Sequence, residues 1–195
     1  TPGSSIYLQG GRDVELHGRV VAGGLIGPNG VIWAGPDSVI EVTAGEQVLV
    51  DTALIASKAV TLTTTEVAGA DDGGYAVVIT SAGGLTAAGI TSDNSGGLVK
   101  FDVAGDVTIA GVILSGGVMR QTFDVAGNLT SETINWSTEE SRVYLKSAGQ
   151  LYLGALTATE SGGEVEIGAT IRANQRIELI GGVSDDNIGV RMPGG

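Results

Sequence analysis

Apolar and polar residues alternate along many short stretches of this chain. Positions 99, 101 and 103 hold valine, phenylalanine and valine, whereas Lys100 and Asp102 between them are charged. A period of two predicts a β-strand with one face turned inward. No window shows apolar residues at helical spacing over three turns, and the frequent glycines would destabilise a helix. The chain is therefore predicted to be all-β and built of short strands.

An Ala-Gly dipeptide recurs at a fixed spacing in the middle of the chain. It occupies positions 82–83, 104–105, 126–127 and 148–149, with 22 residues from each glycine to the next. Recurrence at a fixed period is typical of a solenoid, in which one unit stacks on copies of itself. Glycine-rich breaks within each unit separate about three short strands. The first apolar column aligned by this period contains Ile79, Phe101, Phe123, Leu145 and Ile167.

The predicted fold is a single-stranded right-handed parallel β-helix (β-solenoid) with about three short strands per coil. The right hand follows from the preference of parallel crossovers. A coil period of about 22 residues in the middle region predicts about nine coils over the 195 residues. We expect one continuous β-helix fragment of a longer chain. Its parts are irregular coils in residues 1–75, regular 22-residue coils in 76–166, and shorter coils with a C-terminal loop in 167–195.

Composition supports a folded β-rich chain and narrows the possible partners. Glycine contributes 33 of the 195 residues, and hydrophobic residues make up 42%. This apolar content is too high for a disordered segment, and the glycines follow no collagen triplet. The net charge of −12 disfavours nucleic acid and anionic membranes as partners. The absence of cysteine excludes disulfides and thiolate metal sites, and no stretch approaches the roughly 20 apolar residues of a membrane span.

Three segments carry a resemblance to a class of bacterial proteins. They are Phe-Asp-Val-Ala-Gly-Asp-Val-Thr-Ile at 101–109, Val-Tyr-Leu-Lys-Ser-Ala-Gly-Gln-Leu-Tyr-Leu at 143–153 and Ile-Glu-Leu-Ile-Gly-Gly at 177–182. The chain resembles the filamentous haemagglutinin-like parallel β-helices of large bacterial secreted and surface exoproteins, including adhesins. The resemblance implies an elongated scaffold at an extracellular or bacterial cell-surface location. The partners it implies are neighbouring β-helix repeats of the same parent chain or end-to-end copies, and host surfaces or glycans, without membrane insertion.

From the sequence we expect a non-catalytic structural or adhesive scaffold segment, and no enzyme. Paired acids occur at 71–72, 139–140 and 185–186, but each pair lies in a predicted turn. General acid–base catalysis instead needs groups held across a substrate on rigid elements. The alternatives are a polysaccharide-active enzyme or a carbohydrate-binding β-helix, with Trp33 and Trp136 as candidate sugar platforms.

A lesser alternative is an ice-binding β-solenoid. Thr86, Thr108 and Thr130 align in one column in the 22-residue register. A flat ice-binding face needs two adjacent outward columns, and the neighbouring column holds glycine, aspartate, asparagine and glutamine instead. Threonine ladders are otherwise good strand formers on a solvated face.

One candidate metal site follows from the same register. Asp102 and Asp124 fall in one outward column, where two stacked carboxylates about 5 Å apart repel unless a cation such as Ca²⁺ bridges them. No other cofactor and no catalytic residue is predicted. His17 is the only histidine and is expected at the surface. Phe101 and Phe123 are expected to form the core column that contributes most to stability, with truncation of Phe123 to alanine costing about 3–5 kcal/mol.

Overall fold

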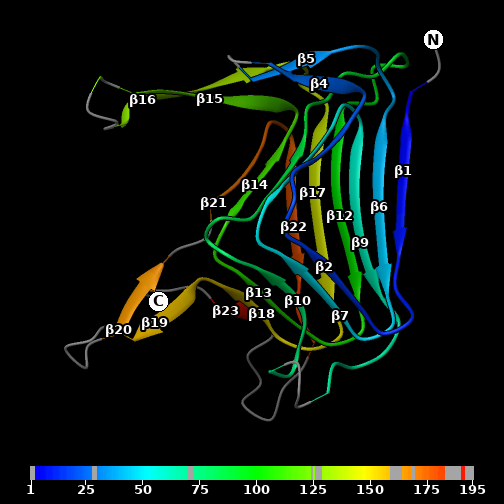
Figure 1. The fold of residues 1–195 in the computed structure, drawn as a ribbon, viewed down its shortest axis with the longest axis vertical. Coiled ribbons are helices and arrows are strands. Elements are labelled where there is room, and N and C mark those ends of the chain that lie inside the picture. The colour runs from blue at the N-terminus through cyan, green and yellow to red at the C-terminus, as the bar shows by residue number, and fades with distance from the viewer. Residues whose placement is uncertain are drawn as a thin grey trace.

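The computed structural model describes residues 3–27, 30–69, 73–123, 125, 129–158, 164–167, 170–182 and 190–191. Every regular element in these ranges is a β-strand, which confirms the all-β prediction. Within the same ranges, no helix is long and apolar enough to cross a membrane. The strands form three large parallel sheets and three two-stranded hairpins (Figure 1).

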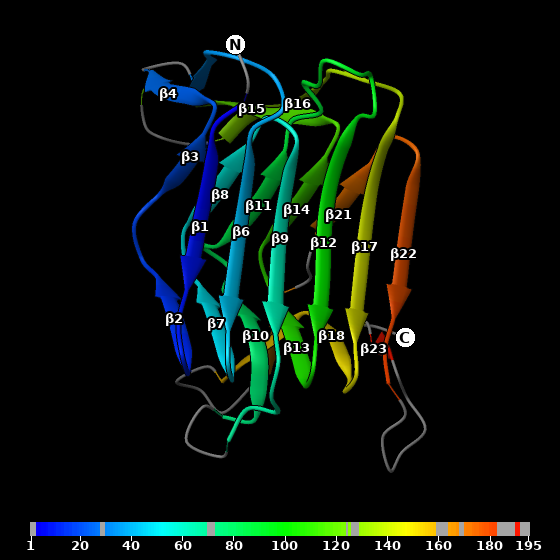
Figure 2. The ribbon, with the colours of Figure 1, turned by 90° about the vertical axis from the view of Figure 1, so that its right-hand side faces the viewer.

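Sheet A forms the right-hand side of the molecule in Figure 1. Figure 2 shows the six strands of sheet A side by side in their spatial order. Sheet A contains β1 (Ser5–Gln9), β6 (Val39–Ala44), β9 (Ala59–Thr64), β12 (Gly97–Val103), β17 (Ser141–Ser147) and β22 (Arg176–Ile180). Sheet B contains β2 (Asp13–Leu16), β7 (Gln47–Val50), β10 (Tyr75–Ile79), β13 (Asp106–Ile109), β18 (Leu151–Leu153) and β23 (Val190–Arg191). Sheet C contains β3 (Val20–Ala22), β8 (Ala53–Ala56), β11 (Gly84–Ala87), β14 (Val112–Ser115) and β21 (Thr170–Ala173). Strands β14 and β21 of sheet C lie to the left of sheet A in Figure 1.

The chain visits the three sheets in a fixed order. β1, β2 and β3 add one strand each to sheets A, B and C, and the chain then returns to sheet A with β6. We call one such visit a pass. Corresponding strands of successive passes pair in parallel, so the prediction of about three strands per repeat is confirmed. The described residues contribute six strands each to sheets A and B and five to sheet C, so they make five complete passes and a sixth through sheets A and B, not nine.

The predicted 22-residue period is wrong because successive passes differ in length. Val39 of β6 pairs with Ala59 of β9, an offset of 20 residues, whereas Ala59 pairs with Leu98 of β12, an offset of 39. Asp102 of β12 pairs with Lys146 of β17, an offset of 44. The pass from β12 to β17 is as long as two predicted units, but about half of its residues form a hairpin outside the three sheets. Residues 76–166 therefore do not divide into regular 22-residue coils.

The same difference in register separates Phe101 from Phe123. Phe101 pairs with Leu62 on one side and Leu145 on the other, all within sheet A. Phe123 belongs to a hairpin strand and pairs with Leu129. The Ala-Gly dipeptide also marks different corners, since 104–105 and 148–149 join sheet A to sheet B, whereas 82–83 joins sheet B to sheet C. The fourth copy, at 126–127, lies outside the described residues.

The core lies between the three sheets and is built from alternate strand residues. In β12, Val99, Phe101 and Val103 are buried, while Lys100 and Asp102 face outward, as the alternation predicts. In-register pairing then stacks buried residues into columns that run from pass to pass. The columns are Ile40, Val60, Val99 and Val143; Val42, Leu62, Phe101 and Leu145; Val48, Val77, Val107 and Leu151; Val50, Ile79, Ile109 and Leu153; and Leu54, Leu85 and Ile113.

Glycine and serine shape the corner where the chain turns from sheet C to sheet A. Gly23 and Gly116 have φ angles of +80° and +89°, and a Cβ at either position would clash with the serine that leads into or begins the next strand of sheet A. Serines at this corner are buried, and the side-chain oxygen of each accepts a backbone hydrogen bond from a neighbouring pass. The backbone N–H of Ser38 donates to Ser57 Oγ at 2.8 Å, and that of Asn174 donates to Ser141 Oγ at 2.7 Å. Polar backbone groups at the corner are thus satisfied without water.

Three hairpins interrupt the passes and account for much of their unequal length. Two leave the corner between sheets C and A, and the third lies between β18 of sheet B and β21 of sheet C (Figure 1). The hairpins are β4 (Gly24–Gly27) with β5 (Gly30–Trp33), β15 (Gly117–Phe123) with β16 (Leu129–Trp136), and β19 (Ala155–Ala158) with β20 (Glu164–Ile167).

The β4–β5 and β15–β16 hairpins share one construction at their base. Each begins directly after a glycine of positive φ, and each pairs a glycine with a tryptophan, Gly24 with Trp33 and Gly117 with Trp136. The residue after the tryptophan donates its backbone N–H to the carbonyl of the positive-φ glycine, at 2.8 Å in the first hairpin and 2.7 Å in the second. An aromatic ring beside a glycine covers backbone that would otherwise be exposed. The same local sequence thus builds the same exit twice.

Candidate functional site

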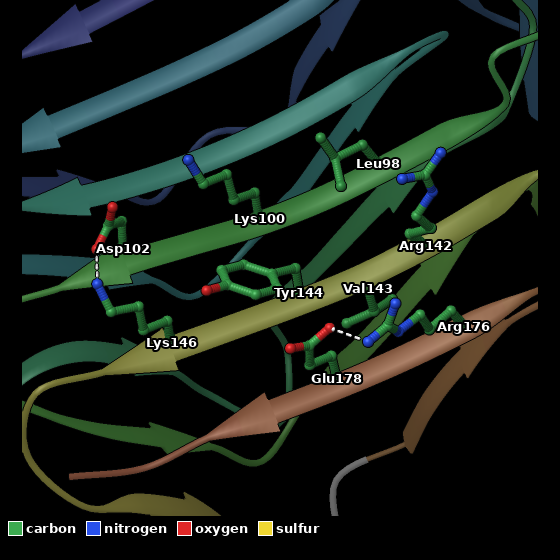
Figure 3. Close-up of a pocket in the computed structure, with 9 residues that line it drawn as sticks. All are labelled: Leu98, Lys100, Asp102, Arg142, Val143, Tyr144, Lys146, Arg176 and Glu178. Atoms are coloured by element: carbon green, nitrogen blue, oxygen red, sulfur yellow. Dashed lines mark hydrogen bonds and ion pairs between the residues drawn. The ribbon is translucent and has the colours of Figure 1, made fainter.

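A shallow hollow lies on the outer face of sheet A, over β12, β17 and β22 (Figure 3). Its volume is about 380 Å³. Figure 3 shows the Tyr144 ring near its centre, between Lys100 of β12 and Glu178 of β22. The lining residues are Leu98, Lys100, Asp102, Arg142, Val143, Tyr144, Lys146, Arg176 and Glu178.

Strand alternation and strand register together build this hollow. Val143 and Leu145 point into the core, so Arg142, Tyr144 and Lys146 of the same strand point outward. In-register pairing extends each of these three positions into a row across the strands. The rows are Leu98, Arg142 and Arg176; Lys100, Tyr144 and Glu178; and Asp102, Lys146 and Ile180. Neighbours within a row lie about 4.8 Å apart at the backbone, and successive rows about 6.7 Å apart.

The hollow is positively charged although the protein is acidic. Four of the ten lysines and arginines of the chain line it together with only two carboxylates, whereas the net charge of the whole chain is −12. Lys146 Nζ lies 3.4 Å from Asp102 Oδ1, and Arg176 Nη2 lies 2.8 Å from Glu178 Oε2.

Lys100 and Arg142 are the two cations of the hollow that have no carboxylate partner in the described part of the chain. Among the described residues, neither side chain makes a hydrogen bond or an ion pair. The positive charge also ends sharply at the neighbouring strand, because Ala59, Thr61 and Thr63 of β9 occupy the same three rows. The two unpaired cations therefore belong to a bounded patch on three strands.

This arrangement is better suited to binding an anion than to acid–base catalysis. Guanidinium and ammonium groups donate strong hydrogen bonds to carboxylate, sulfate or phosphate oxygens. A half-buried tyrosine ring adds a flat apolar surface with a polar tip. Asp102 and Glu178, the two carboxylates, each already face a cation from their own or the adjacent strand. They are not presented as a pair across one reacting centre, which general acid–base work requires.

Asp102, one of the two predicted calcium ligands, is part of this hollow. Its partners in register are Thr63 and Lys146, so the register places no second aspartate beside it. Asp124, the other predicted ligand, lies outside the described residues. The column that paired them rested on the 22-residue period, and β15 leaves the sheets before that position. In the part of the chain that the structure describes, no group of three or more His, Asp or Glu residues is placed to hold a metal ion.

His17 lies at the surface, as predicted, and has two acidic neighbours. Its Nδ1 lies 2.6 Å from Asp51 Oδ2, and its Nε2 lies 3.1 Å from Glu15 Oε2. The hydrogen bond with Asp51, followed by that with Glu15, raises the pKa of His17 above its ordinary value of 6.5. Because Asp51 follows β7 and His17 follows β2, this contact ties the first pass to the second.

The predicted sugar platforms lie on two separate hairpins, and the predicted threonine column is spread over two sheets and a hairpin. Trp33 and Trp136 lie on different hairpins, each beside a glycine, and Trp136 is 44% exposed. Thr86 lies in sheet C, Thr108 in sheet B and Thr130 in the hairpin strand β16. The threonine column expected for ice binding is therefore not formed.

Of the paired acids, only those at 139–140 lie within the described residues. They sit between β16 and β17, where Glu140 Oε2 accepts a hydrogen bond of 2.6 Å from Gln175 Nε2. The described partner of this carboxylate is thus an amide that helps to join two passes. The pairs at 71–72 and 185–186 lie outside the described residues.

Sequence reasoning missed the hollow as a unit. One signal was present, because Arg142, Tyr144 and Lys146 alternate with buried residues on a single strand. Their neighbours Lys100 and Glu178, however, become adjacent at offsets of 44 and 34 residues. No fixed period brings these residues together.

No family model, no curated protein and no solved structure matches this chain.

Proposed function

We propose that residues 1–195 form one continuous single-stranded right-handed parallel β-helix that serves as a non-catalytic scaffold segment of a large secreted or cell-surface bacterial protein. The observation that carries this proposal is the fixed order of strands through sheets A, B and C over five complete passes, with apolar columns that continue from one pass to the next. A core of this kind extends by repetition, because each pass packs mainly on its neighbours. The right hand is expected from the general preference of parallel crossovers.

The mechanism of such a scaffold is mechanical. The stacked sheets hold the hairpins and the charged hollow at fixed positions along one body, so a partner meets several surfaces at a constant spacing. The resemblance of segments 101–109, 143–153 and 177–182 to filamentous haemagglutinin-like β-helices supports an extracellular setting and a host surface or glycan as the partner.

A carbohydrate-related role is the second candidate, and the hollow on sheet A is the observation that favours it. Of its two forms, binding is favoured over cleavage, because both carboxylates in the hollow are held by cations. The open face of a sheet also excludes little water from a ligand, whereas catalysis of sugar cleavage benefits from an enclosed site.

A depolymerisation assay tests the non-catalytic part of the proposal. The purified protein is incubated with acidic and neutral polysaccharides, and new reducing ends and unsaturated products are measured against heat-denatured protein. We expect no release of either. Release that disappears in the Asp102→Asn or Glu178→Gln variant would identify an enzyme and overturn the scaffold proposal.

Labelling of intact cells tests the location. An antibody against the protein should stain the producing bacterium without permeabilisation. Staining that appears only after lysis would contradict a secreted or surface role.

A further inference from the structure

We propose that the hollow on sheet A is a binding site for an anionic oligosaccharide that carries carboxylate or sulfate groups on its sugars. Tyr144 forms the floor, and Arg142, Arg176 and Lys100 contact the anionic groups. This site goes beyond the proposed scaffold function, because binding in the hollow can be measured whether or not the protein also cleaves the sugar.

Arg142 and Arg176 are close enough together to bind one anionic group between them. Arg142 and Arg176 are partners in register on adjacent strands, so two like charges face each other across the sheet. Such a pair destabilises a sheet unless an anion lies nearby. Glu178 pairs with Arg176 at 2.8 Å, and within the described residues no carboxylate pairs with Arg142. An anionic group between the guanidinium groups would relieve the repulsion and accept their hydrogen bonds.

Tyr144 gives the site a surface for a sugar ring. Its ring is half-buried, and Lys100 lies beside it in register, while Arg142 and Lys146 flank it along the strand. Leu98 extends the apolar part of the floor next to Arg142. An apolar patch bordered by cations matches a ligand with flat apolar faces and charged substituents at its rim.

The sheet itself disfavours an acidic peptide as the occupant. β12 pairs with β9 and β17, and β17 pairs with β12 and β22, so both edges of these two strands are already hydrogen-bonded. Extended peptides that bind sheets do so by adding a strand to an open edge. A ligand over β12 and β17 meets side chains only, which suits a molecule whose hydrogen-bonding groups are hydroxyls and charged substituents. Among the described strands of the hollow, only β22, the last strand of sheet A, has an edge open to strand addition.

The overall charge disfavours nucleic acid. A net charge of −12 repels a long polyanion from most of the surface, and the positive patch spans only three strands. A short or intermittently charged chain can place its anionic groups on the patch and keep the rest of its length away from the acidic surface.

Calorimetric titration with defined sugars tests the site. The probes are a short oligogalacturonate, its fully methyl-esterified form, and an oligosaccharide of the same length whose sugars carry sulfate groups and no carboxylates. Each is titrated at low and at physiological salt. We expect binding of one or both charged probes, no binding of the ester, and a loss of affinity as salt rises. The comparison of the two charged probes decides between carboxylate and sulfate as the recognised group.

Substitutions test the named residues. Arg142→Ala and Tyr144→Ala should each weaken binding of the charged probe about tenfold, and Tyr144→Phe should retain it because the ring is kept. Arg120→Ala is the matched control, because it removes the same charge from an exposed position on β15, outside the hollow. Circular dichroism and thermal melting verify that each variant is folded.

Several outcomes would overturn the site. They are binding of the ester as tight as that of the charged probes, no binding of either charged probe, an unchanged affinity of a folded Arg142→Ala variant, and an equal loss in Arg120→Ala. Tighter binding of polyglutamate or of single-stranded DNA than of either sugar would overturn the ligand class. Depolymerisation of the probe would contradict the non-catalytic scaffold but not the binding site. The failure of the scaffold proposal is thus distinguishable from the failure of the proposed site.

Discussion

Phe101 is the largest of the fully buried side chains, and it lies at the centre of sheet A between Leu62 and Leu145. Truncation to alanine removes most of a ring from a packed core that has neighbours on both sides. We expect Phe101→Ala to lower the free energy of unfolding by about 3–5 kcal/mol, measured by urea denaturation.

Two comparisons make the Phe101 prediction specific. Phe101→Leu keeps most of the volume and should cost less than about 1.5 kcal/mol. Phe123→Ala makes the same truncation in β15, outside the three sheets, and should cost less than Phe101→Ala. A loss below about 1 kcal/mol for Phe101→Ala would contradict the register described for sheet A.

His17 provides a prediction about pH. Both of its ring nitrogens face carboxylates, and these hydrogen bonds raise its pKa in the folded protein. A raised folded pKa means that the contact stabilises the fold fully below the unfolded pKa of about 6.5 and that this stabilisation is lost as the pH rises through the folded pKa. Because the chain has a single histidine, its Hε1 proton can be followed directly by NMR. The midpoint should lie above 6.5.

The Asp51→Asn variant tests the cause of that shift. Removing this carboxylate should move the midpoint down, because the hydrogen bond with Asp51 is the largest contribution to the raised pKa. Glu139→Gln removes the same charge far along the chain, between β16 and β17, and should leave the midpoint unchanged. A midpoint at or below 6.5, or one that Asp51→Asn does not move, would contradict the described contact.

Among the elements, the hairpins are separable from the sheets. Between β8 and β9 the chain passes from sheet C to sheet A with only Ser57 and Lys58, whereas between β14 and β17 it adds the whole β15–β16 hairpin. Replacing residues 116–140 by Ser-Lys should therefore leave the three sheets in register. We expect the strand signal in circular dichroism and cooperative unfolding to be retained, with a loss of about 1–2 kcal/mol.

A deletion inside a sheet is the control for the hairpin. Removing β13 interrupts sheet B and takes Val107 and Ile109 out of two buried columns, so this variant should fail to fold. Equal damage from both deletions would show that the hairpin is an integral part of the core.

The strands were predictable from sequence, whereas their partners were not. Alternation at 99–103 predicts β12 and its buried face, and the Ser-Gly-Gly segment at 115–117 predicts the corner after β14. Local chemistry decides both features. Pairing depends instead on the length of chain between strands, and the β15–β16 hairpin happens to give a pass of 44 residues, twice the spacing of the Ala-Gly dipeptide. The Ala-Gly dipeptides at 104–105 and 148–149 therefore mark equivalent corners, whereas the copy at 126–127 led to the prediction of an additional coil between them.

The candidate site was less predictable for the same reason. The alternation of β12 predicts that Asp102 faces outward, and the structure confirms this position. Its neighbour across the strands is Lys146, and a wrong register supplied Asp124 in its place. The charges that lie side by side on a sheet come from three or more passes. An error in the predicted length of one pass therefore places the wrong residues next to each other and predicts the wrong kind of site.

At the scale of the whole molecule, stability should decline from the middle passes to the ends. Core residues of β9 and β12 are buried, whereas Ile177 of β22 is 44% exposed, and the inward residues Ile6 and Leu8 of β1 are only partly buried. A terminal pass has a neighbour on one side only, so it opens at a lower free energy than a central one. Hydrogen exchange read by mass spectrometry should find peptides from β9 and β12 most protected and those from β1 and β22 least. Uniform protection along the chain would instead indicate a single cooperative unit.

The exit between sheets C and A has a consequence for how such chains diverge. The sheets accept either a two-residue connection or a complete hairpin at this point, so packing of the core does not fix the length of the segment. Its length and sequence can therefore change under selection for binding to a partner. Insertions and deletions in related genes should accumulate at this point while the buried columns keep their composition. For the same reason it is a natural place to graft a foreign epitope, which the paired Gly-Trp base would hold at a fixed distance from the body.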